Sequence, residues 1–267
     1  MDKIKISIPG GNGRMGRTLI SQILNSDNLT LSSSNTLANE KEVGIDLGTL
    51  VGLEKINKKL TDDKYVIYQD TDVIIDFTTP ESSLFHAQTA SEKGIPIVIG
   101  TTGFDKKQLE LLKNLSTFIP IVISANFSIG ISVMQSLIKD CVKKLGFDWD
   151  IEVLETHHNQ KVDAPSGTAL LIGNAAAEAR KQKLEEVKSI SRDGFVGKRK
   201  KNEIGFAVLR GGDVVVEHSM RFYNKNERIE INHIATSRSI FASGAIRSAI
   251  WAKESKPGFY SLEDVFS

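Results

Sequence analysis

The stretch Ile4-Lys-Ile-Ser-Ile-Pro-Gly-Gly-Asn-Gly-Arg-Met-Gly16 decides the fold of this chain. Its first five residues alternate toward a β-strand, and a helical pattern follows the glycines to about Asn25. The spacing G-x-G-x-x-G from Gly11, after a strand and before a helix, is typical of dinucleotide binding, because glycines let the backbone approach a pyrophosphate closely. A tight turn without a ligand is the alternative interpretation.

Short apolar strands alternate with helices through the rest of the first half. The patterns predict strands at residues 29–34, 73–76, 95–99 and 119–124, and helices at 81–93 and 105–115. Asp105 with Gln108 resembles a capping box, and Gly94 ends the preceding helix. This alternation predicts an α/β fold with a parallel, doubly wound sheet of the Rossmann type.

The pattern changes after residue 127. It predicts an amphipathic helix at 128–145, a strand at 149–154, three further strands at 205–210, 213–223 and 227–236, and a closing helix at 241–253. Gly211-Gly212 and residues 224–226 are short connections, which predict antiparallel neighbours and hence a mixed or antiparallel sheet. We therefore expect a first domain at 1–127, completed by 237–267, and an α+β domain at 128–236.

Composition excludes several classes of function. Lysine and arginine total 34 and aspartate and glutamate total 33, so no overall charge recruits nucleic acid or a membrane surface. The basic run Lys198-Arg-Lys-Lys201 is interpreted as a solvated surface. Cys141 has no second thiol and no metal-ligand spacing. With no signal peptide and no run of transmembrane length, we expect a cytoplasmic protein.

A second informative stretch is Glu155-Thr-His-His-Asn-Gln-Lys-Val-Asp-Ala-Pro-Ser-Gly-Thr168. His157 and His158 titrate near neutral pH, and Lys161 adds a cation. Ser166-Gly167-Thr168 leads into an alanine-rich helical pattern whose first N–H groups can hold a carboxylate or phosphate. Singly, these features fit a helix N-cap and exposed histidines. Four of them within fourteen residues predict a substrate site.

Three segments follow apolar strands at the carboxyl edge of the predicted parallel sheet: Asp76-Phe-Thr-Thr-Pro80, Gly100-Thr-Thr-Gly103 and Ser124-Ala-Asn-Phe127. Each also fits a polar turn, but together they predict a cofactor crevice. The acid that usually binds the ribose is absent from residues 32–37, and no arginine or lysine replaces it there, although Arg14 is close in sequence. The sequence therefore predicts NADH or NADPH without choosing between them.

The remaining histidines have no obvious chemistry. His218 and His233 alternate with apolar residues of their strands, so we interpret both as hydrogen-bonded core residues. His86 lies on a helix with nothing nearby in the sequence to recruit it. No metal site is expected.

With these motifs assembled, the chain resembles, over essentially its whole length, the dihydrodipicolinate reductase family, also called 4-hydroxy-tetrahydrodipicolinate reductases, of bacterial lysine and diaminopimelate synthesis. The resemblance rests on these segments: residues 10–16, 76–78, 100–103, 125–127, 155–158, 161–168 and Arg210-Gly-Gly-Asp213. The block His-His-x-x-Lys-x-Asp-Ala-Pro-Ser-Gly-Thr is the most specific. The family often has an acid, sometimes with an arginine, where this chain has Thr36 and Leu37, and an arginine can occur at the position of Thr79.

The resemblance implies NAD(P)H-dependent reduction of a cyclic dicarboxylate imine, with His157 as proton donor and Lys161 as its cationic partner. It implies these substrate-binding residues: His158, Ser166, Gly167, Thr168 and Arg238. It implies these cofactor-binding residues: Gly10, Gly11, Asn12, Gly13, Arg14, Met15, Thr36, Phe77, Thr78, Gly100, Thr101, Thr102, Ser124, Ala125, Asn126 and Phe127. It also implies a homotetramer, a second domain that binds substrate and mediates oligomerisation, and closure of the domains if cofactor and substrate lie on different ones.

Two other interpretations also fit the sequence. One is a different Rossmann dehydrogenase of amino-acid metabolism, for instance one that acts on a semialdehyde, although Cys141 on an apolar helix fits a catalytic cysteine poorly. The other is a sensor that binds NAD(P) without chemistry. An assay of NADPH oxidation with the imine tests the sensor alternative.

Overall fold

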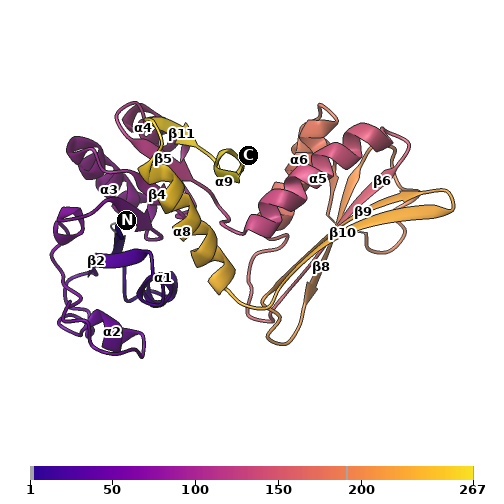
Figure 1. Ribbon diagram of the computed structural model, residues 1–267. Helices are drawn as coiled ribbons and strands as arrows, with labels where there is room; N and C mark the ends of the chain where they lie inside the picture. Colours follow the sequence, from indigo (N-terminus) through magenta and orange to yellow (C-terminus); the bar gives the residue numbers. More distant parts are fainter. Residues whose placement is uncertain (1–2, 191, 267) are drawn as a thin grey trace. The chain divides into compact units, whose positions relative to one another are not determined.

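The computed structural model describes residues 3–190 and 192–266 (Figure 1). The chain divides into two compact units. The first comprises Met1–Ser128 and Ser239–Ser267, and the second comprises Ile129–Arg238.

The first unit is built on a six-stranded sheet with the order β11-β5-β4-β3-β1-β2, in which every pair is parallel. Its strands are β1 (Ile4–Pro9), β2 (Leu29–Asn35), β3 (Val73–Asp76), β4 (Ile97–Ile99), β5 (Pro120–Ile123) and β11 (Gly258–Tyr260). The predicted parallel, doubly wound sheet is confirmed. Strand β11, near the C-terminus, was not predicted from the sequence.

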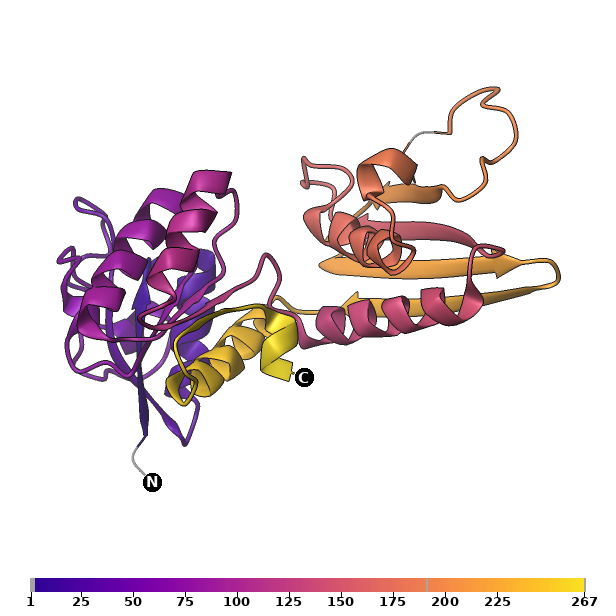
Figure 2. The same cartoon turned by 90° about the horizontal axis from the view of Figure 1, so that it is seen from above.

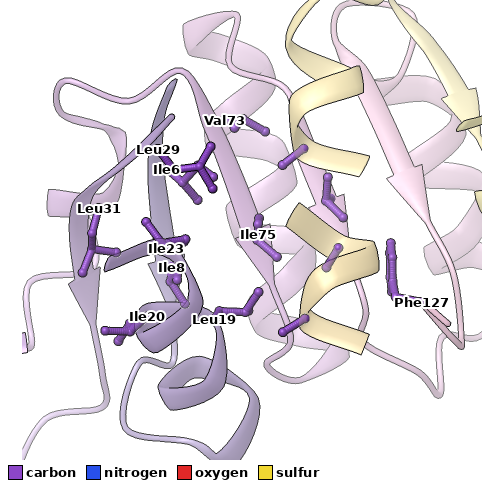
Figure 3. Packing of buried hydrophobic residues seen from close by; sticks show 14 of the residues in the cluster. Ile6, Ile8, Leu19, Ile20, Ile23, Leu29, Leu31, Val73, Ile75 and Phe127 are labelled. Carbon is purple, nitrogen blue, oxygen red and sulfur yellow. The ribbon is translucent and has the colours of Figure 1, made fainter. Parts of the chain in front are cut away.

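Helices cover both faces of this sheet, which is why β3, β4 and β5 are continuous apolar runs. The helices are α1 (Arg14–Leu24), α2 (Leu47–Leu50), the 3-10 helix η1 (Val66–Tyr68), α3 (Pro80–Lys93), α4 (Lys106–Leu115), α8 (Ser239–Lys253) and α9 (Leu262–Phe266). On strand β3, Val73 and Ile75 pack in one apolar core with α1 and α8, whereas Ile74 packs in another with α3 and α4 (Figure 3). The predicted capping box of Asp105 and Gln108 is present at the start of α4.

The closing helix α8 packs back on the first unit, as its sequence predicts. It contacts α1 and strands β3, β4 and β5. Phe127 lies beside this helix (Figure 3), and a Cβ added at Gly244 would lie 1.8 Å from the Phe127 carbonyl oxygen. Only glycine permits so close an approach of the two backbones.

The second unit is a mixed sheet with the order β10-β9-β6-β8-β7, covered on one face by two helices that lie side by side (Figure 1). Its strands are β6 (Asp150–His157), β7 (Lys188–Ser189), β8 (Ile204–Arg210), β9 (Val216–Asn224) and β10 (Glu227–Ala235). Its helices are α5 (Ile129–Leu145), α6 (Gly167–Ala179) and the short α7 (Leu184–Val187). Inward residues of β6, β8 and β9 and apolar residues of α5 and α6 form its core.

The pairing predicted across Gly211-Gly212 is wrong. Strand β8 pairs in parallel with one edge of β6, and β9 pairs antiparallel with the other edge, so β6 separates them. The glycines instead continue the ladder beyond β6, because Gly211 N–H donates to the His157 carbonyl and Asn159 N–H donates to the Gly212 carbonyl. The five residues 211–215 connect β8 to β9 and can span roughly 16 Å. Neighbouring strands are about 5 Å apart, so this connection is long enough to pass the end of β6. The β9–β10 hairpin is confirmed.

The basic run differs from the expected solvated surface at one residue. It lies in the long loop between β7 and β8 (Figure 2). The Arg199 guanidinium is largely buried and bonds to Asp150 at 2.8 Å, to Glu152 at 3.1 Å and to the Ile151 carbonyl at 3.0 Å. Arg199 therefore anchors the loop to strand β6, whereas Lys198, Lys200 and Lys201 are exposed.

Two negative observations apply to residues 3–190 and 192–266. None of their helices combines the length and hydropathy needed to span a membrane. Nor do three or more of their histidine, cysteine, aspartate or glutamate side chains gather in a group that could hold a metal ion.

Candidate active site

The glycine loop forms a cradle at the carboxyl end of β1. Gly13 is the N-cap of α1, and among the described residues no side chain caps this helix end or places an acid in its first turn. The first N–H groups of a helix lack partners within the helix and attract anions. A Cβ on Gly16 would lie 2.3 Å from the Gly10 carbonyl oxygen, so the loop must be glycine to fold this tightly. These features fit the pyrophosphate of a dinucleotide.

The other predicted cofactor segments lie at the same edge of the sheet. Gly100 N–H donates to the Asp76 carbonyl at 2.8 Å and Ser124 N–H donates to the Ile99 carbonyl at 3.1 Å, which ties the ends of β3, β4 and β5 together. The rings of Phe77 and Phe127 are in contact, with centroids 5.6 Å apart. The parallel strands therefore bring these segments into one neighbourhood, as predicted.

An open cavity of about 310 Å³ lies beside these strand ends. Its lining comprises Thr101, Thr102, Gly103, Phe104, Leu109, Ile123, Ser124, Ala125 and Phe259. Phe259 is an addition that sequence reasoning missed, because strand β11 was not recognised. A mixed apolar and hydroxyl lining suits a planar ring with a polar substituent.

A buried carboxyl group, that of Asp76, lies at the end of β3 at this edge of the sheet. Asp76 has no exposed surface, and its Oδ1 accepts hydrogen bonds from the Thr78 N–H at 2.8 Å and the Thr78 hydroxyl at 2.6 Å. Burial raises the pKa of Asp76 to about 6, although the bonds from Thr78 act in the opposite direction. Asp76 thus holds the turn that carries Thr78, one of the predicted cofactor residues.

At the position of the missing acid, the Thr36 hydroxyl donates to Asn12 Oδ1 at 2.6 Å. Arg14 is exposed, and the structure adds a second cation beside this loop, Arg17. Arg17 donates to the Asn12 carbonyl at 3.0 Å and the Leu50 carbonyl at 2.7 Å, and it pairs with Glu42 at 3.3 Å. Sequence reasoning missed Arg17, although its place one helical turn after Gly13 was a usable signal.

In the second unit, strand β6 delivers Glu155 and His157 to the same buried face, because side chains two residues apart point the same way. His157 Nδ1 lies 2.5 Å from Glu155 Oε2. The Glu155 carboxylate also accepts from Ser166 N–H at 2.9 Å and from two nitrogens of Arg210 at 2.7 and 3.0 Å. The structure therefore joins the predicted proton donor, the start of α6 and an arginine through one carboxylate.

The charges around His157 act in opposite directions. Burial acts to raise the pKa of Glu155, but the hydrogen bonds from Arg210, Ser166 N–H and His157 outweigh it and hold that pKa below its ordinary value. Burial lowers the pKa of His157, and the Glu155 carboxylate offsets this only in part, while Lys161 adds to the lowering. The His157 ring is therefore neutral at neutral pH in the absence of a ligand.

Two further predicted residues meet in the second unit. Arg238 Nη2 and His158 Nε2 are 3.3 Å apart, although 80 residues separate them in the chain. Lys161 Nζ donates to Asp163 Oδ1 at 2.6 Å, and Arg210 donates to the Asp163 carbonyl at 2.7 Å. Asp163 was part of the quoted motif but received no role from the sequence.

The start of α6 combines both interpretations of Ser166-Gly167-Thr168. Ser166 is the N-cap, and its hydroxyl accepts from Ala169 N–H at 3.1 Å. Gly167 is exposed, and nothing lies within 4 Å of where its Cβ would be. The capping interpretation of Ser166 is confirmed, and the open helix start beside it still suits an anion.

The other histidines differ in part from their predicted roles. His218 is buried and hydrogen-bonded, as predicted: its Nε2 lies 3.2 Å from the Ser166 hydroxyl, and its ring also contacts His157. His233 is half-buried opposite His218 on β10. His86 has a partner that its neighbours in the sequence do not reveal, since the Tyr68 hydroxyl lies 2.8 Å from His86 Nδ1. That contact comes from a distant segment, which no local pattern reveals.

Comparisons with known proteins agree with this architecture. The family models "Dihydrodipicolinate reductase, N-terminus" and "Dihydrodipicolinate reductase, C-terminus" match residues 4–127 and 130–266. The 4-hydroxy-tetrahydrodipicolinate reductase of Bartonella bacilliformis is 46% identical over 265 residues, 98% of each chain. That of Parvibaculum lavamentivorans is 44% identical over 263 residues, 98% of this chain and 97% of the relative.

Two solved structures show the fold. Dipicolinate-bound dihydrodipicolinate reductase from Paenisporosarcina sp. TG-14 has a TM-score of 0.76 at 24% identity, over 98% of this chain and 99% of that one. An amine dehydrogenase from Mycobacterium smegmatis has a TM-score of 0.62 at 11% identity, over 97% of this chain and 95% of that one.

The Rossmann unit with its glycine cradle and the attached α+β unit define an oxidoreductase that uses NADH or NADPH. Within that class, the two family models and the relatives above 40% identity are decisive. The chain belongs to the dihydrodipicolinate reductase family.

Proposed function

We propose that this chain reduces 4-hydroxy-tetrahydrodipicolinate to tetrahydrodipicolinate with NADH or NADPH, in lysine and diaminopimelate synthesis in the cytoplasm, with His157 as the proton donor. The observation that supports this most directly is the bond from His157 Nδ1 to the buried Glu155 carboxylate, which also accepts from the start of α6. An imidazole, which can accept and donate a proton, is thereby held beside a site for an anion.

The first unit carries the proposed cofactor site. The N–H groups at the start of α1 would hold the pyrophosphate, with Gly10, Gly11, Asn12, Gly13, Arg14 and Met15 around it. Thr36 would face the adenosine ribose. The segments at Phe77–Thr78, 100–102 and 124–127 would line the nicotinamide end, where the cavity lies. When bound, the nicotinamide supplies the hydride.

The second unit carries the proposed substrate site. The substrate is a dianion, so its two carboxylates require cations and N–H donors. His158 and Arg238, which are already in contact, would bind one carboxylate, and Gly167 and Thr168 with the Ser166 cap would bind the other. Lys161 would add positive charge beside the ring.

Conversion of the 4-hydroxy ring to the product takes one hydride and one proton and releases water, which balances the reaction. The proton comes from His157 Nε2 and goes to the carbon next to the one that accepts the hydride. His157 is neutral without a ligand because burial lowers its pKa. A bound dianion would raise that pKa, so substrate binding would help to protonate its own acid.

We also propose that the second unit mediates assembly into a homotetramer. Exposed apolar side chains lie on the face of its sheet that the helices leave uncovered, at Leu209 and at Ile234, which is 64% exposed. Apolar groups exposed on a sheet mark an interaction surface. Light scattering coupled to size exclusion tests this, since a mass of one 29.4 kDa chain would contradict it.

The decisive experiment is steady-state kinetics with the imine generated in situ and with NADH and NADPH compared side by side. We expect loss of absorbance at 340 nm that depends on the imine with at least one nucleotide. A folded protein that binds nucleotide but oxidises neither in the presence of the imine would contradict the proposal and favour a sensor. Oxidation of NADH or NADPH with another keto acid in the absence of the imine would favour a different dehydrogenase.

A further inference from the structure

The Glu155 carboxylate is completely enclosed by hydrogen-bond donors. Its side chain has no exposed surface. Oε2 accepts from His157 Nδ1 and Arg210 Nη1, and Oε1 accepts from Ser166 N–H and Arg210 Nη2. A carboxylate has only acceptors, so four donors from three elements satisfy it without competition.

This arrangement decides which nitrogen of His157 is available for chemistry. A neutral imidazole has one donor and one acceptor nitrogen, and the partner of one nitrogen sets the role of the other. Since Glu155 is ionised and can only accept, Nδ1 must carry the proton. Nε2 is then the nitrogen left to gain and release a proton.

We propose that Glu155 is the positioning residue for the reaction: it fixes His157 in the Nδ1–H tautomer and, through Ser166 N–H, holds the start of α6 in register with that ring. This rests on the proposed function for the role of His157, but the tautomer itself is a property of the protein without substrate. One buried carboxylate thus aligns the proton donor and the predicted carboxylate site.

Arg210 balances the charge of the Glu155 carboxylate. Parallel pairing of β6 with β8 places Arg210 opposite His157, so its guanidinium reaches Glu155 with two nitrogens and also donates to the Asp163 carbonyl. A carboxylate alone beside the imidazole would stabilise the protonated ring, raise its pKa and so oppose transfer of its proton. The arginine neutralises much of that charge while it keeps the carboxylate ionised.

Three other charged or titratable groups act on the ring besides Glu155: Lys161 from the loop after β6, Arg210 from β8 and His218 from β9, while Asp163 of the same loop bonds to Lys161. Burial lowers the pKa of His218 to about 3, so it stays neutral and its ring contributes no charge. Glu155 is the only carboxylate among them that bonds to the ring within the described residues.

Replacement of Glu155 by glutamine reveals the role, because an amide has one acceptor end and one donor end. In either orientation, the amide NH₂ group of glutamine replaces one carboxylate oxygen. That NH₂ donor then faces either Arg210 and His157 or Arg210 and Ser166 N–H. If the amide nitrogen faces the ring, His157 Nδ1 becomes the acceptor and the proton moves to Nε2. We expect Glu155→Gln to lower kcat by roughly 10²-fold or more, with little change in the KM for NADH or NADPH.

The test is the tautomer of His157 by histidine ¹⁵N NMR of the full chain without substrate, with the resonances assigned by their loss in His157→Gln. We expect Nδ1–H in the natural protein and a shift toward Nε2–H in Glu155→Gln. The matched control is Glu152→Gln, on the same strand, whose carboxylate also bonds to two arginines, Arg192 and Arg199, but not to a histidine. It should leave the tautomer and kcat unchanged.

The outcomes separate this inference from the proposed function. An Nε2–H tautomer in the natural protein would overturn the positioning role, and this outcome does not depend on whether Glu155→Gln folds. An unchanged tautomer and kcat in folded Glu155→Gln would overturn it as well. Partial recovery of kcat in Glu155→Asp, with Nδ1–H restored, would support it. Nδ1–H in a protein that does not reduce the imine would refute the proposed function and leave the positioning intact.

Discussion

The imidazole rings of His157 and His218 meet edge to face, with centroids 5.4 Å apart and ring planes at 80°. The Ser166 hydroxyl accepts from Ala169 N–H, so its own hydrogen is free to donate to His218 Nε2, 3.2 Å away. His218 therefore connects the helix cap to the ring of the proposed proton donor. It supports the site while remaining a core residue of β9.

His218→Phe should keep the ring contact with His157 and lose the bond to Ser166. Because burial keeps His218 neutral, we expect the pH profile of kcat to keep its shape and kcat to fall no more than about 10-fold, the loss of one neutral hydrogen bond. Turnover measured from pH 5.5 to 8.5 checks this. A displaced pH profile would mean that His218 titrates during the reaction.

His157→Gln and Lys161→Ala should each lower turnover by roughly 10²- to 10⁴-fold, because each removes a group required for proton delivery. Nucleotide binding, measured by fluorescence titration, should be nearly unchanged, since its residues lie in the first unit. Lys188→Ala, at an exposed lysine of the second unit, is the control. A loss of only a few-fold in either variant would refute its assigned role.

Thr36→Asp should shift the cofactor preference toward NADH by roughly 10-fold or more, because a carboxylate at this position repels the 2′-phosphate of NADPH and bonds to the ribose hydroxyls. The ratio of kcat/KM for the two nucleotides measures the effect. Asn114→Asp adds the same charge at an exposed position of α4 and should leave the ratio unchanged. An unchanged ratio in Thr36→Asp would place the ribose elsewhere.

Ser166→Ala should lower the free energy of unfolding by about 1 kcal/mol through loss of the helix cap, and should also raise the KM for the imine. Urea unfolding and kinetics measure the two effects. Thr79→Ala removes the cap of α3, where Thr79 accepts from Ser82 N–H at 3.4 Å, and should lower stability without changing the KM for the imine. If both variants changed the KM for the imine equally, the cap of α6 would have no special role.

His86 should make the protein sensitive to acid. Burial lowers its folded pKa from 6.5 to about 4, so the unfolded chain binds the proton first as the pH falls. This difference in proton binding leaves the free energy of unfolding unchanged above pH 6.5 and lowers it by about 3 kcal/mol at pH 4. His86→Gln can keep a bond to Tyr68 without titrating, and should lose less stability between pH 7 and pH 4. Equal losses in urea unfolding would show that His86 does not contribute.

Much of the fold was predictable because the signals are local. Apolar runs, the glycine turn and the capping residues located the first five strands of the Rossmann sheet and its main helices. The same reading failed where a short connection was taken for a hairpin, since Gly211-Gly212 joins strands that flank β6. Turn residues indicate that the chain changes direction, but they do not indicate which strands pair with each other.

The sequence by itself determined the class of fold, the glycine cradle and the residue types of the proposed chemistry, because periodicity and motif spacing encode them over a few residues. Only the tertiary structure decided what surrounds His157. Glu155 was in the quoted motif, but its partner Arg210 lies 55 residues further on, and His218 lies 52 residues after Ser166. Those contacts follow from strand order, which depends on long-range pairing and burial that no local pattern records.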